Sequence, residues 1–304
     1  MSRYDILVIG GGPAGYTAAL YAARAGFHTA VVEKLFAGGQ MTQTQQIDNY
    51  PGFAEGIDGI QLGMQMQQGA QRFGVTTILA EVFSAELEGS VKRLHTSEGI
   101  LEAGVVIIAT GADHRHLSID REEAFAGKGV AYCAACDGMF YRGKTVAVVG
   151  GGNSAASEAL VLSRIAKKVY LIHRRDSLKA SKSYHEPLQQ AENVEFIWNS
   201  QVSQLLGEEK LSGVRLQNVL SGEEQELQLD GLFISIGRQP ATELFRGQLE
   251  LDESGYIVAD ESTRTSVPGV YAVGDVRTKE VRQIVTAAAD GAIAAHYAEN
   301  YLLK

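Results

Sequence analysis

Short apolar runs that lead into glycine-rich turns recur along the chain. Residues 4–9 and 144–149 are two such runs, and each is followed by an alanine-rich stretch and then by another apolar run, at 29–32 and 169–172. Runs of this length are typical of strands that are buried on both faces of a parallel sheet. The order strand, turn, helix, strand therefore predicts two βαβ units, which is the pattern of an α/β fold.

The same pattern predicts further elements. Apolar runs indicate strands at 105–111, 194–198, 231–237 and 269–274, with a hairpin region at 207–229. Helical spacing indicates helices at 14–25, 60–73 and 282–301, and another that follows the second glycine turn through Glu158 to about Ile165. The run between Gln40 and Gly52 is too polar for a core element and too patterned for a linker, and a surface loop is its simplest interpretation.

The first glycine-rich turn carries the pattern G-x-G-x-x-G at Gly10, Gly12 and Gly15. A helix follows it, and then a strand that ends in Glu33. Glycines in this pattern let the backbone approach a pyrophosphate on the helix N-terminus, and the acid accepts hydrogen bonds from a ribose 2′-hydroxyl. This context predicts a dinucleotide site with an unphosphorylated ribose, as in FAD or NAD. A tight packing turn is the alternative.

A second copy of the pattern begins at Gly150, 140 residues after Gly10, and has the form G-x-G-x-x-A with Gly152 and Ala155. Two mononucleotide-type units in one chain suggest two dinucleotides.

The two copies differ at the end of their second strand. Where the first copy has Glu33, 18 residues after its motif, the second has His173, followed by Arg174 and Arg175. A carboxylate repels a 2′-phosphate, whereas guanidinium groups bind one through paired hydrogen bonds. The second site is therefore predicted to prefer NADP(H), although two arginines taken alone would indicate a solvated face.

Cys133 and Cys136 are the only cysteines, and two residues separate them. Structural zinc takes four ligands, and the sequence offers no second cysteine pair or suitably spaced histidine pair. A two-residue spacer lets the sulfurs close a small disulfide and favours a thiolate near neutral pH. Asp137 follows directly and is placed to move a proton. A redox-active dithiol is the preferred interpretation, and two inert cysteines are the alternative.

Composition excludes other classes of function. The 304 residues include 27 Lys and Arg and 36 Asp and Glu, for a net charge of −9, which disfavours binding to nucleic acid or to anionic membranes. No apolar run approaches the roughly 18 residues of a membrane-spanning helix. We expect no secretory signal at the first residues. A reactive dithiol in such a chain predicts the reducing cytoplasm.

Three strand-like runs end at residues suited to a cofactor: at Gly111, at Gly237 and at Asp275, which follows Gly274. An aspartate at a strand end that precedes a helix is well placed to bind a ribityl or phosphate-linked hydroxyl.

Together these motifs resemble the low-molecular-weight, bacterial-type thioredoxin reductases. The motifs lie at 10–15, 38–40, 48–51, 109–111, 133–138, 150–155, 173–176, 274–275 and 282–283, so the resemblance spans essentially the whole chain. It implies an α/β fold of two Rossmann-like, three-layer domains that bind FAD and NAD(P), the second inserted into the first. The FAD domain would comprise 1–112 and 241–304. The NADPH domain, with the dithiol, would comprise 113–240.

The resemblance also assigns the site residues. Cys136 would face the flavin, Cys133 would attack the disulfide of thioredoxin, and Asp137 would be the general acid. The predicted FAD-binding residues are Gly10, Gly12, Ala14, Gly15, Glu33, Gly39, Gln40, Asn49, Val82, Gly111, Asp275, Arg282 and Gln283. The predicted NADPH-binding residues are Gly152, Asn153, Ser154, Ala155, His173, Arg174, Arg175, Lys179 and Gly237. No metal site is expected.

The implied activity is the reduction of thioredoxin by NADPH, through the flavin and then through the Cys133–Cys136 disulfide by thiol–disulfide exchange. Because the dithiol and NADPH share one domain, that domain is expected to rotate between half-reactions, with hinges near 112–116 and 238–242. The resemblance further implies a homodimer.

Two positions depart from the family's pattern. Lys179 stands where an arginine is common, which keeps the charge and loses the bidentate fork. Lys128 stands where an arginine that contacts the partner often sits. These departures bear on the affinity for NADPH and for the partner.

Other functions on the same fold are alternatives. A flavoprotein that takes electrons from ferredoxin, or a dithiol oxidase that uses oxygen, would tend to lose the second nucleotide motif, which this chain retains. A reductase that serves a peroxiredoxin directly would carry an additional N-terminal thioredoxin-like region. An inactive flavin-binding or NADPH-sensing scaffold would not need the intact Cys-x-x-Cys-Asp sequence.

Overall fold

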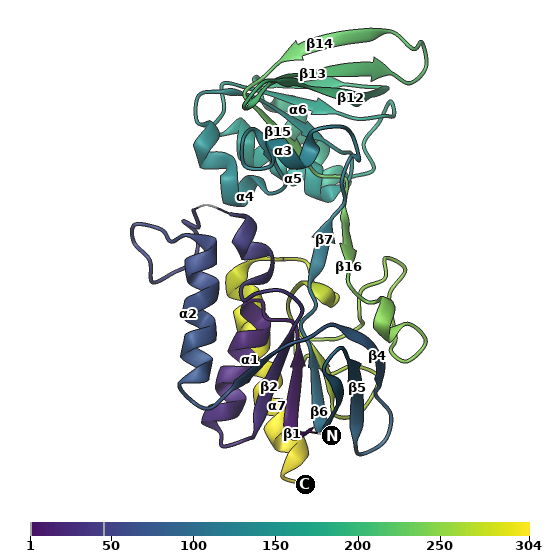
Figure 1. Ribbon diagram of the computed structural model, residues 1–304. Coiled ribbons are helices and arrows are strands. Elements are labelled where there is room, and N and C mark those ends of the chain that lie inside the picture. The colour runs from purple at the N-terminus through teal and green to yellow at the C-terminus, as the bar shows by residue number, and fades with distance from the viewer. Residues whose placement is uncertain (1, 45) are drawn as a thin grey trace. The chain divides into compact units, whose positions relative to one another are not determined.

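One mixed and one parallel β-sheet carry the apolar runs of the sequence, and the chain divides around them into two units (Figure 1). The computed structural model describes residues 2–44 and 46–304. The first unit combines Met1–Asp113 with Gln239–Lys304, and the second is His114–Arg238. The predicted class, an α/β fold with one dinucleotide-binding type of unit inserted into another, is confirmed.

β1 (Ser2–Ile9) lies inside the sheet of the first unit, whose order is β3-β2-β1-β6-β5-β4, with β17 also paired to β6. The other strands are β2 (Thr29–Glu33), β3 (Thr76–Leu79), β4 (Val82–Glu86), β5 (Lys92–Thr96), β6 (Gly99–Ile108) and β17 (Val270–Ala272). β4 and β5 pair antiparallel, as do β5 and β6, and the remaining pairs are parallel. Alternate residues of β1 enter the hydrophobic cores on opposite faces of the sheet.

Three helices gather on one face of this sheet: α1 (Pro13–Arg24), α2 (Gly59–Gln71) and α7 (Ile284–Leu302) (Figure 1). Short 3-10 turns are η1 (Gly39–Gln43), η4 (Glu243–Phe245) and η5 (Gly274–Val276). Pro13 at the first helical position is pre-organised for α1, because its fixed φ suits a helix and its missing N–H has no partner there anyway.

α1 and α7 approach each other so closely that Gly291 of α7 has no room for a side chain. A Cβ at this position would overlap the carbonyl oxygen of Ala14 and lie 2.8 Å from the backbone nitrogen of Ala18. Alanines dominate the buried faces of both helices, so the close approach continues along their length. This contact fixes the last helix of the chain onto the helix that follows the first glycine turn.

The second unit has a five-stranded parallel sheet in the order β11-β10-β9-β15-β8. Its strands are β8 (Val130–Ala131), β9 (Thr145–Val149), β10 (Lys168–Ile172), β11 (Val194–Ile197) and β15 (Gly231–Ile234). An antiparallel sheet of β12 (Ser200–Gly207), β13 (Leu211–Asn218) and β14 (Glu224–Gln228) shares a hydrophobic core with it.

The helices of the second unit are α3 (Glu122–Phe125), α4 (Ala134–Asp137), α5 (Asn153–Ser163) and α6 (His185–Gln190), with 3-10 turns η2 (Gly138–Tyr141) and η3 (Lys182–Tyr184). α5 buries alanines and Leu162 against β9 and β10 in a second core. This is the βαβ arrangement that the second glycine turn predicts.

The chain crosses between the units twice. β7 (Ala112–His114) leads out of the first unit and β16 (Arg238–Pro240) returns to it, and these two strands pair with each other (Figure 1).

Some elements differ from the hydrophobic pattern. The last helix begins at Ile284, because Gln283 caps it in a reciprocal capping box with Thr286. The region 207–229 belongs to a three-stranded sheet that begins earlier, at Ser200. β3, β4 and β5 escape the pattern because they are short and carry no continuous apolar run. The buried positions of β5 include Lys92 and Thr96.

None of the helices within 2–44 and 46–304 combines the length and the apolar character that crossing a bilayer requires.

We expect Gly291→Ala to destabilise the first unit by roughly 1–3 kcal/mol, the usual cost of forcing atoms into a closely packed contact. Gly69→Ala on α2 is the matched control. No atom lies within 4 Å of a Cβ at Gly69, so the higher helix propensity of alanine should stabilise by about 0.5–1 kcal/mol. Urea unfolding followed by circular dichroism measures both changes, and equal effects of the two substitutions would contradict a tight α1–α7 contact.

Candidate active site

The first glycine turn is closed on one side and open on the other. Gly10 has a φ of +102°, and a Cβ there would overlap the carbonyl oxygen of Ala109. A Cβ on Gly15 would overlap the carbonyl oxygen of Gly10, whereas a Cβ on Gly12 would meet no atom within 4 Å. The turn is therefore packed tightly against the sheet and leaves free space beside Gly12.

α1 starts at this open side. Gly12 is its N-cap residue, no side chain caps the helix, and its first turn contains Ala14. The first amides of a helix lack intrahelical acceptors and lie at the positive end of the helix dipole. Uncapped amides beside free space fit a pyrophosphate, which is the group that the motif predicts.

Glu33 is held at the same turn. Its Oε2 accepts a hydrogen bond from the Gly11 amide at 2.6 Å, and its Oε1 accepts one from the Leu35 amide at 3.0 Å. The Gly38 amide donates to the carbonyl oxygen of Gly11 at 2.8 Å. These bonds bring the end of β2 and the loop that follows it onto the glycine turn.

Gly39 and Val82 lie close to this group in the fold. A Cβ on Gly39 would lie 3.3 Å from the Cα of Gly12. Val82 begins β4, two residues after Ala80, whose amide donates to the carbonyl oxygen of Glu33 at 2.9 Å. The structure therefore gathers Gly12, Glu33, Gly39 and Val82 at one end of the first unit's sheet.

Gln40 lies beside the segment that contains Gly111. The Gln40 Nε2 donates to the carbonyl oxygen of Ala112 and, at 3.2 Å, to Oδ1 of Asp113. Gly111 has a φ of +74°, and its carbonyl oxygen accepts a hydrogen bond from the Ala241 amide at 3.0 Å.

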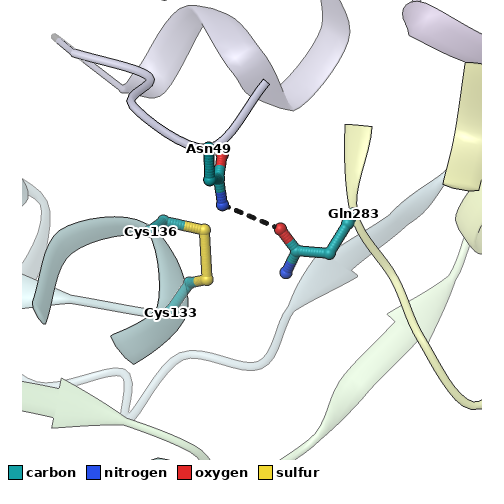
Figure 2. Close-up of a disulfide and its surroundings, with 4 residues drawn as sticks. All are labelled: Asn49, Cys133, Cys136 and Gln283. Carbon is teal, nitrogen blue, oxygen red and sulfur yellow. Dashed lines mark hydrogen bonds between the residues drawn. A yellow bond between two sulfur atoms is a disulfide. The ribbon is translucent and has the colours of Figure 1, made fainter. Parts of the chain in front are cut away.

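The C-terminal candidates are linked to one another around the start of α7. Arg282 donates from Nε to the carbonyl oxygen of Asp275 at 3.4 Å, and Gln283 Oε1 accepts from Asn49 Nδ2 at 3.1 Å (Figure 2). Gly274 connects this group to α1, because a Cβ on it would lie 3.0 Å from the Cβ of Ala14. Residues from both ends of the sequence thus meet in the first unit.

The second glycine turn repeats this arrangement in the second unit. A Cβ on Gly150 would overlap the carbonyl oxygen of Ser235, and a Cβ on Gly152 would meet no atom within 4 Å. α5 begins without a side-chain cap. Asn153 Oδ1 accepts a hydrogen bond from the Ser181 amide at 2.7 Å. In the same helix Ser154 is exposed, whereas Ala155 is buried.

His173 lies where the first unit has Glu33. Its ring packs against Gly151, at which a Cβ would overlap the ring. The side chain is buried, and its Nε2 atom has no hydrogen-bond partner among the described residues. Burial lowers the pKa of His173, and the nearby charges of Arg175, Arg174 and Lys179 lower it further. The ring is therefore neutral at pH 7.

The loop after β10 folds back onto the second turn. The amide of Lys179 donates to the carbonyl oxygen of Gly151 at 2.7 Å, and the side chains of Arg174, Arg175 and Lys179 are exposed. Gly237, with a φ of +104°, lies two residues beyond Ser235, and its carbonyl oxygen accepts a hydrogen bond from the Arg115 amide at 3.0 Å.

Cys133 and Cys136 form a disulfide with a Cα–Cα separation of 5.3 Å (Figure 2). Cys133 is the N-cap residue of α4, and Asp137 is its last residue. Burial raises the pKa of Asp137 to about 6, so this carboxyl exchanges a proton close to neutral pH. Among the described residues, no three His, Cys, Asp or Glu side chains gather in a way that would hold a metal ion.

Over residues 4–291 the chain matches the protein family described as pyridine nucleotide-disulphide oxidoreductase. The chain belongs to this family. It is 47% identical over 301 residues to the thioredoxin reductase of Streptomyces clavuligerus, a match that covers 98% of this chain and 94% of that protein. The solved thioredoxin reductase from Streptococcus pyogenes is 43% identical with a TM-score of 0.92, and the alignment covers 99% of both chains. The FR conformation of the Lactococcus lactis thioredoxin reductase is 42% identical with a TM-score of 0.70, again with 99% of both chains covered.

The resemblance to thioredoxin reductases is thereby confirmed. Membership in the pyridine nucleotide-disulphide oxidoreductases makes this chain an oxidoreductase, and it implies a flavin and a pyridine nucleotide. The two open glycine turns, each at an uncapped helix N-terminus, have the geometry that two dinucleotides require. The roles of the individual residues remain predictions.

Sequence reasoning missed the support beneath the disulfide of this oxidoreductase. Tyr132, directly before Cys133, donates to Oε1 of the buried Glu122 at 2.8 Å, and His116 Nδ1 lies 3.0 Å from the same oxygen. Oε2 of Glu122 accepts from the Ser118 amide at 2.9 Å. Burial and this carboxylate raise the pKa of Tyr132, so the phenol keeps its proton and donates to Glu122. This bond holds the residue before Cys133 in place.

A second missed residue is Asp290 of α7. It is 4% exposed, and its carboxylate bonds Arg277 through two nitrogens, at 2.8 and 2.9 Å, and Lys279 Nζ at 2.8 Å. Oδ2 also accepts from the Gly274 amide at 2.9 Å, next to Asp275. Burial opposes the charge on Asp290, but Arg277 and Lys279 outweigh it and hold its pKa below the usual value. No spacing in the sequence signals this network.

We expect Asp290→Asn to destabilise the first unit by about 3–5 kcal/mol at pH 7, because Arg277 would become a buried charge without its partner. The depressed pKa of Asp290 means that this contribution is full above the unfolded value of about 3.9 and is lost as the pH falls through the folded value. The difference from wild type should therefore shrink toward pH 3.

Urea unfolding at pH 7 and at low pH, with flavin retention as a second readout, checks this expectation. Asp58→Asn is the matched control, since Asp58 caps α2 by accepting from the Gln61 amide and asparagine caps equally well. A pH-independent loss in Asp290→Asn would contradict the ionic role of Asp290.

Proposed function

We propose that this protein is an NADPH-dependent thioredoxin reductase that uses FAD. The observation that carries the proposal is the Cys133–Cys136 disulfide with Asp137 beside it, in the same unit as a glycine turn that Arg174 and Arg175 flank. A disulfide that accepts electrons, together with a site for a 2′-phosphate, indicates a disulfide reductase whose electron donor is NADPH. The relatives named thioredoxin reductase support this reading of the site.

The first unit is the proposed FAD site. The uncapped first turn of α1 binds the pyrophosphate, and Glu33 accepts hydrogen bonds from the adenosine ribose. The linked group of Asp275, Arg282, Gln283 and Asn49 lines the remainder of the site. FAD, when bound, accepts a hydride and passes two electrons to a disulfide.

The second unit is the proposed NADPH site. The uncapped first turn of α5 binds the pyrophosphate. Arg174 and Arg175 bind the 2′-phosphate, and Lys179, held at the turn by its backbone bond to Gly151, adds a third positive charge. The neutral ring of His173 adds no repulsion to these cations. A carboxylate at the same place, as in the first unit, would repel the phosphate.

Thioredoxin is the proposed disulfide substrate. The Cys133 thiolate attacks one sulfur of the substrate disulfide, which forms a mixed disulfide and expels the other substrate sulfur as a thiolate. Cys136 then attacks the Cys133 sulfur, which restores the internal disulfide and releases the second substrate thiolate. Asp137, with its pKa near 6, supplies and accepts the protons that these thiolates exchange.

A protein substrate suits the surface beside the dithiol. Met139 and Phe140 of η2, two and three residues beyond Asp137, are 54% and 49% exposed. Large apolar side chains exposed next to a reactive disulfide fit a docking protein better than a small solvated disulfide.

The second unit is proposed to turn between half-reactions, because it holds both the dithiol and the NADPH site and the flavin belongs to the first unit. β7 and β16 are the proposed hinges. Two solved relatives of nearly equal identity and coverage give TM-scores of 0.92 and 0.70, a spread that supports mobility between units in this family.

A homodimer in the cytoplasm is the proposed working form. Leu35, Phe36, Leu79 and Phe83 of the first unit expose large apolar side chains, which favours burial against another protein surface such as a second copy. Ferredoxin as donor and dithiol oxidation are not favoured, because both halves of the second nucleotide motif and its three cations are present.

Anaerobic titration of the flavin-loaded protein with NADPH, and separately with NADH, tests the cofactor proposal through the flavin absorbance. We expect NADPH to bleach the flavin at a concentration at least tenfold lower than NADH. Replacing Arg174 and Arg175 by alanine should remove this preference, because hydrogen bonds to a charged group contribute about 1.5–3 kcal/mol each. Lys167→Ala, an exposed lysine outside the loop, is the control that should retain it. No bleaching by either nucleotide would rule out the nicotinamide proposal.

Single serine substitutions test the roles of the two cysteines. With a thioredoxin that has one cysteine, activated by thionitrobenzoate, Cys136→Ser should accumulate a mixed disulfide through Cys133, because the resolving thiol is absent. Wild-type protein resolves the complex and should accumulate little. Non-reducing electrophoresis and peptide mass spectrometry measure both. If only Cys133→Ser forms the complex, the two roles are reversed.

A further inference from the structure

Glu158 lies in the second turn of α5, and the proposed reaction does not use it. Its side chain is half-buried, and its Oε2 atom is buried without a hydrogen-bond partner among the described residues. A buried polar atom without a partner has lost its hydrogen bonds to water, so native proteins keep few such atoms. A carboxyl group in this situation, close to a redox site, calls for a functional explanation.

The surroundings of Glu158 are those of the dithiol. Burial raises the pKa of Glu158 to about 7. The side chain of Ser235 and the backbone of Ala134, which lies between the two cysteines, act in the opposite direction and favour the charged form.

The groups that face Glu158 come from different elements. Arg238 of β16 favours the ionised carboxyl, and Asp137 of α4 disfavours it. The strands beneath α5 present apolar side chains to the helix, including Val148 of β9 and Leu171 of β10. Glu158 and Asp137 are therefore two carboxyl groups, both with a raised pKa, at one dithiol turn.

We propose that Glu158 is a positioning residue for the dithiol turn, acting through the Ala134 amide, and that its carboxylate takes up a proton when the Cys133–Cys136 disulfide opens. This inference rests on the proposed function, because it requires a disulfide that is reduced and reoxidised in turnover.

Reduction of the Cys133–Cys136 disulfide takes up two electrons and, with Glu158, two protons. The sulfur–sulfur bond accepts two electrons, which the nicotinamide supplies by way of the flavin, and breaks into two sulfurs. One sulfur takes a proton and becomes a thiol, and the other remains a thiolate. The Glu158 carboxylate takes a second proton from solvent, so the net charge of the pocket is the same before and after reduction. Without that proton, the thiolate and two carboxylates would share a buried site.

The direction of the pH effect follows from the charges. With the disulfide closed, Glu158 titrates near pH 7. A new thiolate nearby raises the pKa of this carboxyl further, because like charges disfavour ionisation. At a pH between the pKa of Glu158 with the disulfide closed and its higher pKa with the disulfide open, reduction binds one proton more than it would without Glu158. The equilibrium constant for reduction then falls an additional tenfold per pH unit, which is about 30 mV for a two-electron couple.

The experiment measures the disulfide equilibrium of the flavin-loaded protein in dithiothreitol redox buffers from pH 6 to 9. Acid quenching, alkylation and mass spectrometry give the fraction of dithiol. Oxidation of dithiothreitol itself releases two protons below its thiol pKa values, so its exchange with wild type should be nearly independent of pH just above pH 7. The equilibrium of Glu158→Gln should shift toward the dithiol tenfold per pH unit relative to wild type. Glu192→Gln, the same substitution at an exposed glutamate of the same unit, should follow wild type. An unchanged slope in Glu158→Gln would overturn the proposal.

A second measurement does not depend on how Glu158→Gln folds. Infrared difference spectra of Asp137→Asn, reduced minus oxidised at pH 8, should show a protonated carboxyl band appearing on reduction. If that band is absent, and if the extra slope disappears in Asp137→Asn but persists in Glu158→Gln, the proton belongs to Asp137 and the inference fails.

The outcomes also separate the inference from the function on which it rests. If NADPH does not reduce the wild-type disulfide at all, the proposed function fails. If NADPH reduces it but neither the slope nor the band depends on Glu158, only the inference fails.

Discussion

The architecture depends on how closely the backbone can approach itself where a strand turns into a helix. In the first unit, Gly10 and Gly15 remove the side chains that would collide with Ala109 and with the turn itself, and Gly150 does the same against Ser235 in the second. This contact holds the start of each helix against the end of the strand that precedes it. It also leaves the helix N-terminus uncapped and facing free space at Gly12 and Gly152. A requirement of packing therefore produces two places at which uncapped backbone amides face free space.

The two turns share a backbone and differ in charge. The two carboxylate oxygens of Glu33 accept hydrogen bonds from the Gly11 and Leu35 amides, which holds this acidic side chain beside the first glycine turn. His173 packs on Gly151 as a neutral ring, and the cations that follow it face solvent. One side chain at an equivalent position thus separates the two sites electrostatically, and the rest of each βαβ unit stays the same. The shared backbone geometry and the difference in charge therefore lie in different parts of the motif.

The features that follow from local patterns were accessible in the sequence. The strands and the helices follow from hydrophobic spacing, and the turns follow from the glycine pattern. The offset between Gly10 and Gly150 reveals the repeat. The supports of the site were not accessible in this way. Asp290, Glu122 and Glu158 are carboxylates on helices, and a pattern treats them as solvated charges. Only the fold shows that Arg277 binds Asp290 and that Tyr132 donates to Glu122. The same holds for the backbone of Ala134, which lies beside Glu158. β5 could not be predicted from the hydrophobic pattern for a related reason, because the polar residues Lys92 and Thr96 occupy buried positions in it.

The pairing of β7 with β16 makes the connection between the units a ribbon and not two independent tethers. The carbonyl oxygen of Gly111 accepts from Ala241 at one end, and that of Gly237 accepts from Arg115 at the other. A two-stranded ribbon twists readily, but its strands resist sliding past each other, because sliding breaks every hydrogen bond in register. A rotation of one unit therefore requires the two crossing strands to twist together. A residue added to one strand would shift its register against the other, so a change in length of β7 would require a matching change in β16.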